Sequence, residues 1–188
     1  MKINSISIIS VMAAAIATTN VNAGTVADFY AGVMVGAGAH TIFANNDSKT
    51  DSSMLAGALI GVDIPLLRVE AEYNYLNSSD FNTNSAMLNA YLKMPSTVIM
   101  PYAGVGLGMV FGGKYEITDS GVTTKFDLDS VPAYQGMLGI TFDLPLLPVK
   151  FDLEGRALYA PDIYKVEATN TTPDLLEYNA RIKVRYIF

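Results

Sequence analysis

The twelve residues "EYNARIKVRYIF" at 177–188 alternate between apolar and polar side chains. One parity carries Tyr178, Ala180, Ile182, Val184, Tyr186 and Phe188, and the other carries Asn179, Arg181, Lys183 and Arg185. Successive side chains of a β-strand point to opposite faces. The segment is therefore predicted to be a strand with one apolar face and one strongly charged face.

The same period of two recurs along the chain. It is clear in "LRVEAEYNY" at 67–75 and in "VKFDLEGRALY" at 149–159, which follow the similar segments "DIPLL" at 63–67 and "DLPLL" at 143–147. Weaker alternation is present at 28–38, 53–63, 85–94, 100–111 and 133–143. Together these segments predict eight strands, and no segment shows a helical period.

The connections between the predicted strands alternate in length. Those after the second, fourth and sixth strands are short and contain proline, whereas those after the first, third, fifth and seventh are longer and polar. This alternation is typical of an up-and-down barrel, with short turns at one rim and long loops at the other. The predicted fold is all-β: an eight-stranded antiparallel transmembrane β-barrel.

Aromatic residues on the apolar parity gather at the two ends of the predicted strands. Near the short turns lie Phe29, Phe142, Phe151, Tyr186 and Phe188, and near the long loops lie Tyr73, Tyr75, Tyr134, Tyr159 and Tyr178. Two aromatic girdles around an aliphatic band are typical of a barrel that meets both interfaces of a membrane. We therefore expect the apolar face to contact lipid.

The polar parity must then face the lumen. It carries seven bases and four acids, namely Arg68, Glu70, Glu72, Lys93, Lys150, Asp152, Glu154, Arg156, Arg181, Lys183 and Arg185. An eight-stranded barrel is only wide enough for side chains to fill it, so we expect a paired charge network. Asp152 and Glu154 should meet Arg181 and Lys183, and the surplus of bases leaves room for bound water or an anion.

The chain begins with a segment typical of export. Lys2 precedes an apolar run at 6–17, and Val21-Asn22-Ala23 matches a small-residue cleavage pattern. We predict a signal peptide at 1–23 and a barrel domain at 24–188. The net charge of −6 argues against nucleic-acid partners, and the absence of cysteine excludes disulfides and thiol chemistry.

The eight-strand pattern, "PYAGVGLGMVF" at 101–111 and the terminal "VRYIF" at 184–188 resemble the small outer-membrane β-barrel family that includes the OmpA barrel, OmpX and opacity-type surface proteins. The resemblance implies a surface protein, or surface antigen, in the outer membrane of Gram-negative bacteria. It also implies that the barrel-assembly machinery reads Phe188 as part of its signal. Outer-membrane lipid and lipopolysaccharide would then surround the barrel, which we expect to be a monomer.

Two motifs allow a catalytic interpretation, and for each a structural one is favoured. The glycines of "GVGLG" at 104–108 lack the spacing of a phosphate-binding loop, and all three would lie on the lumen face. His40, the only histidine, could face Ser52 and Ser53 across the first hairpin, as in lipid A-modifying barrels, yet nothing nearby orients a base. We expect His40 to be a solvated loop residue, and we expect no enzyme, no cofactor and no metal site.

The long loops carry ten acids against four lysines, and such a face is usually only solvated. We expect the protein to act through these loops, in adhesion, surface recognition or envelope integrity, with a host protein or another surface ligand as partner. The alternative is a narrow porin-like channel that passes small solutes through a base-rich lumen. A lipid A-modifying enzyme is the third hypothesis.

Overall fold

The computed structural model describes residues 27–44, 47–78, 81–94, 98–119, 122–127, 130–144, 147–163 and 174–188, with backbone alone at 44, 47–49, 81, 114–119 and 122–127. These residues form β1 (Asp28–Ala44), β2 (Asp47–Asp63), β3 (Leu67–Ser78), β4 (Phe81–Lys93), β5 (Ile99–Asp119), β6 (Val122–Asp127), β7 (Val131–Asp143), β8 (Val149–Ala160) and β9 (Asp174–Ile187). Within them there is no helix long and apolar enough to cross a membrane. The predicted signal peptide at 1–23 lies outside the described residues.

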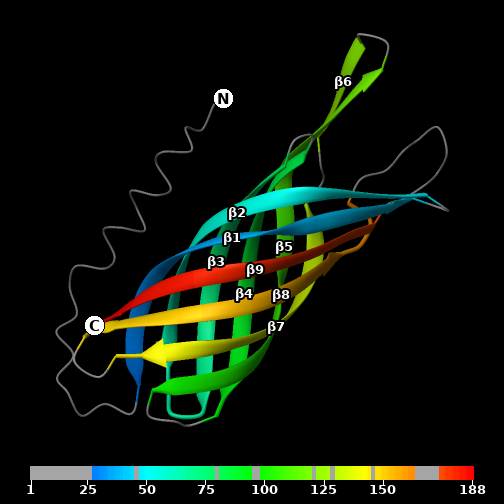
Figure 1. Cartoon of the computed structure of the whole chain (residues 1–188). Coiled ribbons are helices and arrows are strands. Elements are labelled where there is room, and N and C mark those ends of the chain that lie inside the picture. The colour runs from blue at the N-terminus through cyan, green and yellow to red at the C-terminus, as the bar shows by residue number, and fades with distance from the viewer. Residues whose placement is uncertain are drawn as a thin grey trace.

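Eight of these strands close into one antiparallel barrel (Figure 1). Their order around the wall is β4-β3-β2-β1-β9-β8-β7-β5, and the pairing of β4 with β5 completes the ring. The remaining strand, β6, pairs with β5 alone and adds no strand to the wall. The predicted eight-stranded antiparallel barrel is therefore confirmed.

The barrel has two rims, which we call the turn rim and the loop rim. At the turn rim lie the ends of β2, β4 and β7 and the starts of β3, β5 and β8, together with the start of β1 and the end of β9. Phe188 N donates to Phe29 O at 2.9 Å there, next to the β1–β9 pairing. At the loop rim lie the other ends of the strands and the β5–β6 hairpin.

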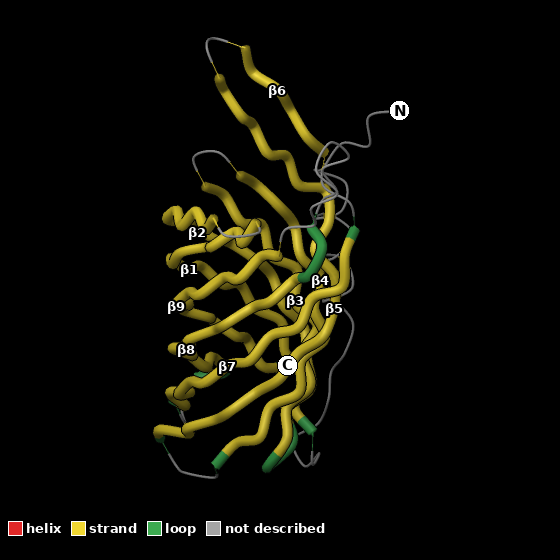
Figure 2. The backbone as a smooth tube through the Cα atoms, turned by 90° about the vertical axis from the view of Figure 1, so that its right-hand side faces the viewer, coloured by secondary structure: helices red, strands yellow, loops and turns green. Residues whose placement is uncertain are grey.

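The strands at the loop rim are longer than the sequence pattern predicts. β1 and β2 remain paired as far as Ala44 and Asp47, although a long loop was expected after residue 38. β5 runs to Asp119 and forms a hairpin with β6, which rises above the barrel in Figure 2. Beyond the wall, antiparallel pairing still satisfies the backbone hydrogen-bonding groups, so these ladders continue without an apolar face to mark them.

A backbone irregularity separates the wall from this projecting hairpin. The β4–β5 register shifts between Asn82 and Asn84, and Gly112 in β5 has a φ of 61°. Asn84 Nδ2 donates to Gly112 O at 3.4 Å. A left-handed residue of this kind favours glycine, and the local bulge bends the strand. Beyond the bulge β5 pairs with β6, while Lys114 and Tyr115 still pair with Asn82 and Phe81 at the start of β4.

Side chains of the wall alternate between outside and lumen. In β9 the basic side chains of Arg181, Lys183 and Arg185 are 0% exposed, while Ile182 between them is 53% exposed. β3 and β8 show the same alternation with acidic residues on the inner side. The outer surface is thus largely apolar and the interior is strongly charged, the reverse of a water-soluble barrel.

Candidate functional site

All eleven charged residues assigned to the lumen point inward. They are Arg68, Glu70, Glu72, Lys93, Lys150, Asp152, Glu154, Arg156, Arg181, Lys183 and Arg185, and all but Lys150 are buried. Lys150, at the turn rim, has a side chain that is 14% exposed. The strand period alone places these residues, because each of them lies on the inner parity of its strand.

A central layer of the lumen consists of Glu70, Glu72, Glu154, Arg181 and Lys183. Lys183 Nζ lies 2.7 Å from both Glu70 Oε1 and Glu72 Oε1, and 3.2 Å from Glu154 Oε2. Arg181 joins opposite walls: Nη1 is 3.0 Å from Glu72 Oε2 on β3, and Nε is 2.9 Å from Glu154 Oε1 on β8. The predicted meeting of Glu154 with Arg181 and Lys183 is present in these contacts.

A second layer lies nearer the turn rim, and we call it the turn-side layer. Its charged members are Asp63, Arg68, Lys93, Asp143, Lys150, Asp152 and Arg185. Arg185 holds Asp152 through Nε at 2.6 Å and through Nη2 at 2.9 Å, and it reaches Asp63 through Nη1 at 3.2 Å. Asp63 also pairs with Lys93.

Strand order predicted that Asp152 would pair with Arg181 and Lys183, but it pairs with neither. Its Cα is opposite Lys183 in the β8–β9 register, yet its carboxylate binds Arg185, the next inward residue along β9. Diagonal neighbours lie within reach of long side chains, and Lys183 is already held by carboxylates of the central layer. The nominal register therefore gives only the neighbourhood of each ion pair.

Toward the loop rim the charges give way to a smaller polar group. Arg156 pairs with Glu177 across β8 and β9, and Arg156 Nη1 donates to Gln135 Oε1 at 3.3 Å. Asn179 Nδ2 donates to Glu177 Oε1 at 2.6 Å. This group links the central layer to the apolar residues above it.

An apolar plug fills the lumen at the loop rim. It consists of Ile42, Leu76, Met87, Val110, Val131, Ala133, Leu158, Ala160, Ile163 and Leu175, all buried and packed together. Ile163 follows β8 and is only 1% exposed. Sequence reasoning missed the plug, because apolar residues were assigned to the outer face and these interrupt the polar parity only near the strand ends.

Two buried acids were also missed, Asp63 at 4% exposure and Glu177 at 3%. With them the eleven predicted charges become seven bases and six acids, and Asp143 pairs with Lys150 at the rim. The expectation of a base-rich lumen is therefore wrong for the described residues. Both acids left a signal: Glu177 shares the parity of Arg181, and Asp63 faces Arg68 across the turn.

Three buried tyrosines complete the polar interior. Tyr30 Oη and Tyr91 Oη donate to Glu70 at 2.8 and 2.9 Å, and Tyr102 Oη donates to Glu154 Oε2 at 2.9 Å. Each satisfies a carboxylate that would otherwise rely on ion pairs alone, which matters where water is scarce. The sequence places all three on the inner parity, but only aromatic residues on the outer parity were considered in the prediction.

The glycines of the "GVGLG" segment make room for these side chains. A Cβ at Gly104 would collide with the ring of Tyr91, and a Cβ at Gly106 would collide with Asn89 and come within 2.9 Å of Gln135 Cγ. The interior is therefore packed against bare backbone along this part of β5. No helix follows the segment, which continues as strand to Asp119.

The structure places His40 differently from the sequence prediction. It belongs to β1, is 3% exposed, and faces Asp51 on β2 and Glu177 on β9 in the strand register. The prediction of a solvated loop residue is wrong, because the β1–β2 ladder continues past this position. Ser52 and Ser53 are opposite Ala39 and Gly38 instead.

The ten aromatic residues assigned to the girdles all lie on the outer parity of their strands. Toward the turn rim are Phe29, Phe142, Phe151, Tyr186 and Phe188, and toward the loop rim are Tyr73, Tyr75, Tyr134, Tyr159 and Tyr178. Neighbouring strands bring some of them together: Tyr134 is opposite Tyr159, and Phe142 is opposite Phe151. The rings of Tyr186 and Phe188 are 5.3 Å apart.

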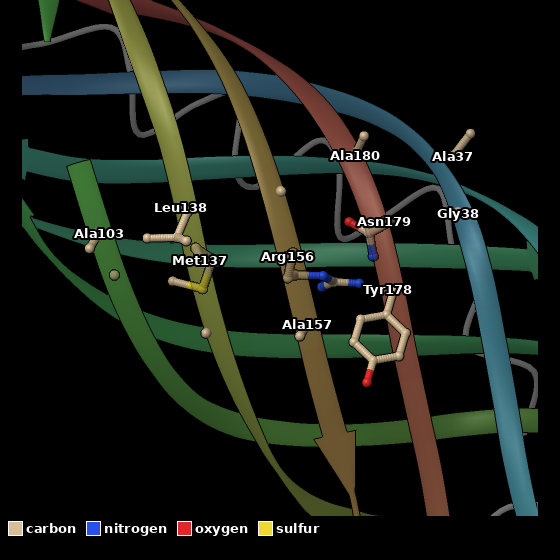
Figure 3. A pocket seen from close by; sticks show the side chains of 13 residues that line it. Ala37, Gly38, Ala103, Met137, Leu138, Arg156, Ala157, Tyr178, Asn179 and Ala180 are labelled. Atoms are coloured by element: carbon tan, nitrogen blue, oxygen red, sulfur yellow. The ribbon is translucent and has the colours of Figure 1, made fainter. Parts of the chain in front are cut away.

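Small residues form a shallow hollow in the wall between these two sets. The hollow, of about 770 Å³, crosses β1, β9, β8, β7 and β5, and its outward lining includes Ala37, Ala180, Gly155 and Gly136 (Figure 3). Leu138 and Tyr178 also line it and are labelled in the same view. Its lining also includes Met137, Arg156 and Asn179, which lie on the inner parity of their strands.

Among the residues that the structure describes, no group of three or more His, Cys, Asp or Glu could hold a metal ion. The lumen carboxylates are instead occupied by Arg, Lys and Tyr partners. The arrangement is that of a structural interior, in which each charge meets an opposite one.

Comparisons with known proteins address the fold. No family model and no curated protein sequence matches the chain. Neisserial surface protein A (NspA) is similar in structure, with a TM-score of 0.56, 20% identity, and coverage of 85% of this chain and 97% of that chain. The N-terminal β-barrel domain of Pseudomonas aeruginosa OprF has a TM-score of 0.51, 14% identity, and coverage of 82% and 97%.

A third structure is the outer membrane protein OprG from Pseudomonas aeruginosa, with a TM-score of 0.50, 11% identity, and coverage of 85% and 95%. At these identities the likeness concerns the fold. The chain therefore has the fold of the small eight-stranded outer-membrane β-barrels, and the resemblance predicted from its sequence is confirmed at that level.

Proposed function

We propose that the protein is an outer-membrane surface barrel that acts through the strands and loops projecting from its loop rim, in adhesion or surface recognition. The observation that carries this proposal is the contrast between a filled interior and extended hairpins at one rim. The apolar outer wall and the shared fold of outer-membrane barrels support the location.

The filled lumen argues against the alternative of a solute channel. The central layer joins opposite walls through Arg181, and the apolar plug lies above it. A channel requires a continuous wet path, and desolvated ion pairs below an apolar plug oppose one. The lumen is also close to charge balance, so it lacks the surplus of bases that the alternative required.

The projecting strands offer a surface that a partner could reach, whereas the filled interior does not. The paired ends of β1 and β2 and the β5–β6 hairpin extend beyond the wall (Figures 1 and 2). Within the described residues β6 pairs with β5 alone, so its other edge is available to a partner. Binding residues are often carried on such segments while a rigid scaffold holds them in place.

The remaining expectations follow from this location. The signal peptide at 1–23 would direct export, and Phe188 at the turn rim would serve recognition by the barrel-assembly machinery. Lipopolysaccharide and outer-membrane lipid would contact the wall. We further propose a monomer without catalytic activity, in line with the pairing of the lumen carboxylates.

A hairpin-less variant tests the proposal. Residues 112–129 are replaced by Asn-Gly, which joins Phe111 to Ser130 next to the Val110–Val131 pair. In cells that depend on this protein for attachment to an epithelial monolayer, the variant should lose most attachment while its surface level stays unchanged. It should also keep normal detergent resistance, because the wall is intact.

Two results would contradict the proposal. One is full attachment by the hairpin-less variant and by a second variant shortened at the tip of β1–β2. The other is a reproducible conductance in planar bilayers that exceeds detergent controls, which would favour the channel. Loss of detergent resistance with normal attachment would instead assign the protein to envelope integrity.

A further inference from the structure

Arg68 is a buried arginine whose hydrogen-bonding capacity the protein leaves largely unused. It lies at the start of β3 with 0% exposure, and its guanidinium carbon is 4.0 Å from the ring centre of Tyr91 and 4.4 Å from that of Tyr102. Nη1 is 3.4 Å from Asp152 Oδ1. Nε and Nη2 donate to no protein atom among the described residues.

The other two fully buried arginines show what this edge normally holds. Arg181 binds Glu154 through Nε and Nη2, and Arg185 binds Asp152 through the same two nitrogens. The Nε and Nη2 hydrogens point the same way and fit a single anionic acceptor side-on. In Arg68 this edge has no carboxylate.

The ion pairs of the turn-side layer leave that edge of Arg68 without an acceptor. The turn-side layer contains four cations, Arg68, Lys93, Lys150 and Arg185, and three acids, Asp63, Asp143 and Asp152. Asp152 is already held twice by Arg185, so Arg68 receives only one long contact from it. The nearby carboxylate of Glu70 also attracts the guanidinium, so what Arg68 lacks is a hydrogen-bond acceptor at Nε and Nη2.

The geometry around Arg68 restricts where a ligand can lie. The tyrosine rings contact the guanidinium carbon and leave the in-plane edge to accept a partner, since ring faces attract cations but satisfy no in-plane N–H. Most of the other unsatisfied lumen atoms are single atoms on scattered side chains, whereas Arg68 contributes two adjacent donors. Lys93 and Lys150 lie between this position and the turn rim, where they would attract an anion.

We propose that the Nε and Nη2 edge of Arg68 binds one small monovalent anion, the size of a halide or formate, inside the turn-side end of the barrel. The lumen as a whole is near charge balance, so the anion exchanges with the solution and binds in the millimolar range. This site is independent of the surface role proposed above. It would fill the lumen further and carry no solute through it.

The first test is a crystal of the detergent-purified barrel grown in sodium bromide, with anomalous diffraction measured at the bromine edge. A bromide peak within hydrogen-bonding distance of both Nε and Nη2 of Arg68 is expected. Water alone at this edge, or a protein acceptor turned onto it, would overturn the proposal.

The second test is in solution. The midpoint of thermal unfolding in detergent is compared in 100 mM sodium bromide and in sodium gluconate of equal ionic strength, since gluconate is too large for the site. For the wild type the midpoint should be about 3–5 °C higher in bromide. Arg68→Lys keeps the charge but lacks the two-donor edge, and should lose this difference.

A matched control is Arg156→Lys, whose partner Glu177 is already in place, and it should keep the bromide effect. A wild type indifferent to the anion contradicts the proposal, even where a bromide peak is present, because that peak would then reflect binding at crystal concentration only. If Arg68→Lys fails to fold, the two wild-type measurements still decide.

Discussion

Arg181 holds two carboxylates from opposite sides of the barrel, Glu72 on β3 and Glu154 on β8. Arg181→Met would leave three buried acids of the central layer with Lys183 as their main cation. Breaking a buried pair on one side typically costs about 3–5 kcal/mol, because the remaining charge is uncompensated. Urea unfolding followed by gel mobility without boiling should show this loss.

Lys150→Met is the matched control for that substitution. Lys150 also binds acids, Asp143 and Asp63, but it lies at the turn rim with partial exposure to solvent. Its removal should reduce the free energy of unfolding by less than about 1 kcal/mol. Equal losses for the two variants would show that burial does not set the strength of this network.

Glycine spacing in β5 gives a second prediction. In Gly106→Ala the new methyl group would collide with Asn89, which also accepts a hydrogen bond from Gln135 at 2.6 Å. Overpacking of this kind costs about 1–3 kcal/mol. Gly136→Ala, on the outer face with nothing within 4 Å of the new Cβ, should be neutral in the same unfolding assay. A neutral Gly106→Ala would mean that Asn89 and its neighbours can move aside at little cost.

The β5–β6 hairpin is attached to the wall through one strand only. Replacing residues 112–129 by Asn-Gly removes every β6 pairing and the two β4–β5 pairs beyond the bulge, but it keeps the β4–β5 ladder from Asn84 to Lys93 and the whole β5–β7 ladder. The thermal midpoint of the shortened barrel should therefore stay within about 2 °C of the full chain, a shift that corresponds to less than about 1 kcal/mol. A large drop would show that the hairpin braces the barrel.

The wall strands could be predicted from sequence, whereas their extensions could not. Alternation marks a strand only where one face meets an apolar environment, as in residues 149–159. In β6, "VTTKFD", the residue types favour a strand, but the segment is only six residues long and stands within a long polar stretch, so it was interpreted as part of a loop. The end of β1 escaped prediction for the same reason.

The interior of the barrel could likewise be predicted only in part. Parity alone indicates that Arg181 and Glu154 lie inside, and their meeting follows from adjacent strands. The apolar plug was not predicted, because Leu158 and Leu175 lie on the inner parity but have the apolar side chains that were assigned to the outer face. Which carboxylate each base binds depends on side-chain length and diagonal reach, as Asp152 shows.

The polarity of the whole barrel can be tested by a charge on its outer wall. Leu138, 69% exposed, lies on β7 midway between Tyr134 and Phe142, so it should sit at the centre of the apolar band. Leu138→Arg should destabilise the barrel folded in lipid vesicles by about 2–4 kcal/mol, the cost typical of a charge at the bilayer midplane. Intact barrel is quantified by gel mobility before and after boiling.

Thr50→Arg is the companion variant. Thr50 is exposed on the part of β2 that extends toward the loop rim, where water should solvate a charge. It should fold into vesicles as well as the wild type does. A harmless Leu138→Arg together with a damaging Thr50→Arg would reverse the assignment of lipid and water to the two regions.

The pairing of β1 with β9 joins segments that are nearly as far apart in sequence as the described chain allows. Until these two strands pair, β1 and β9 each have an unpaired edge, and the charged interior is exposed to hydrocarbon. A partly closed barrel would therefore be unstable in a bilayer, and we expect insertion and closure to proceed together. The pairing of β9 with β1 is therefore the step that would shield both the open edges and the charges.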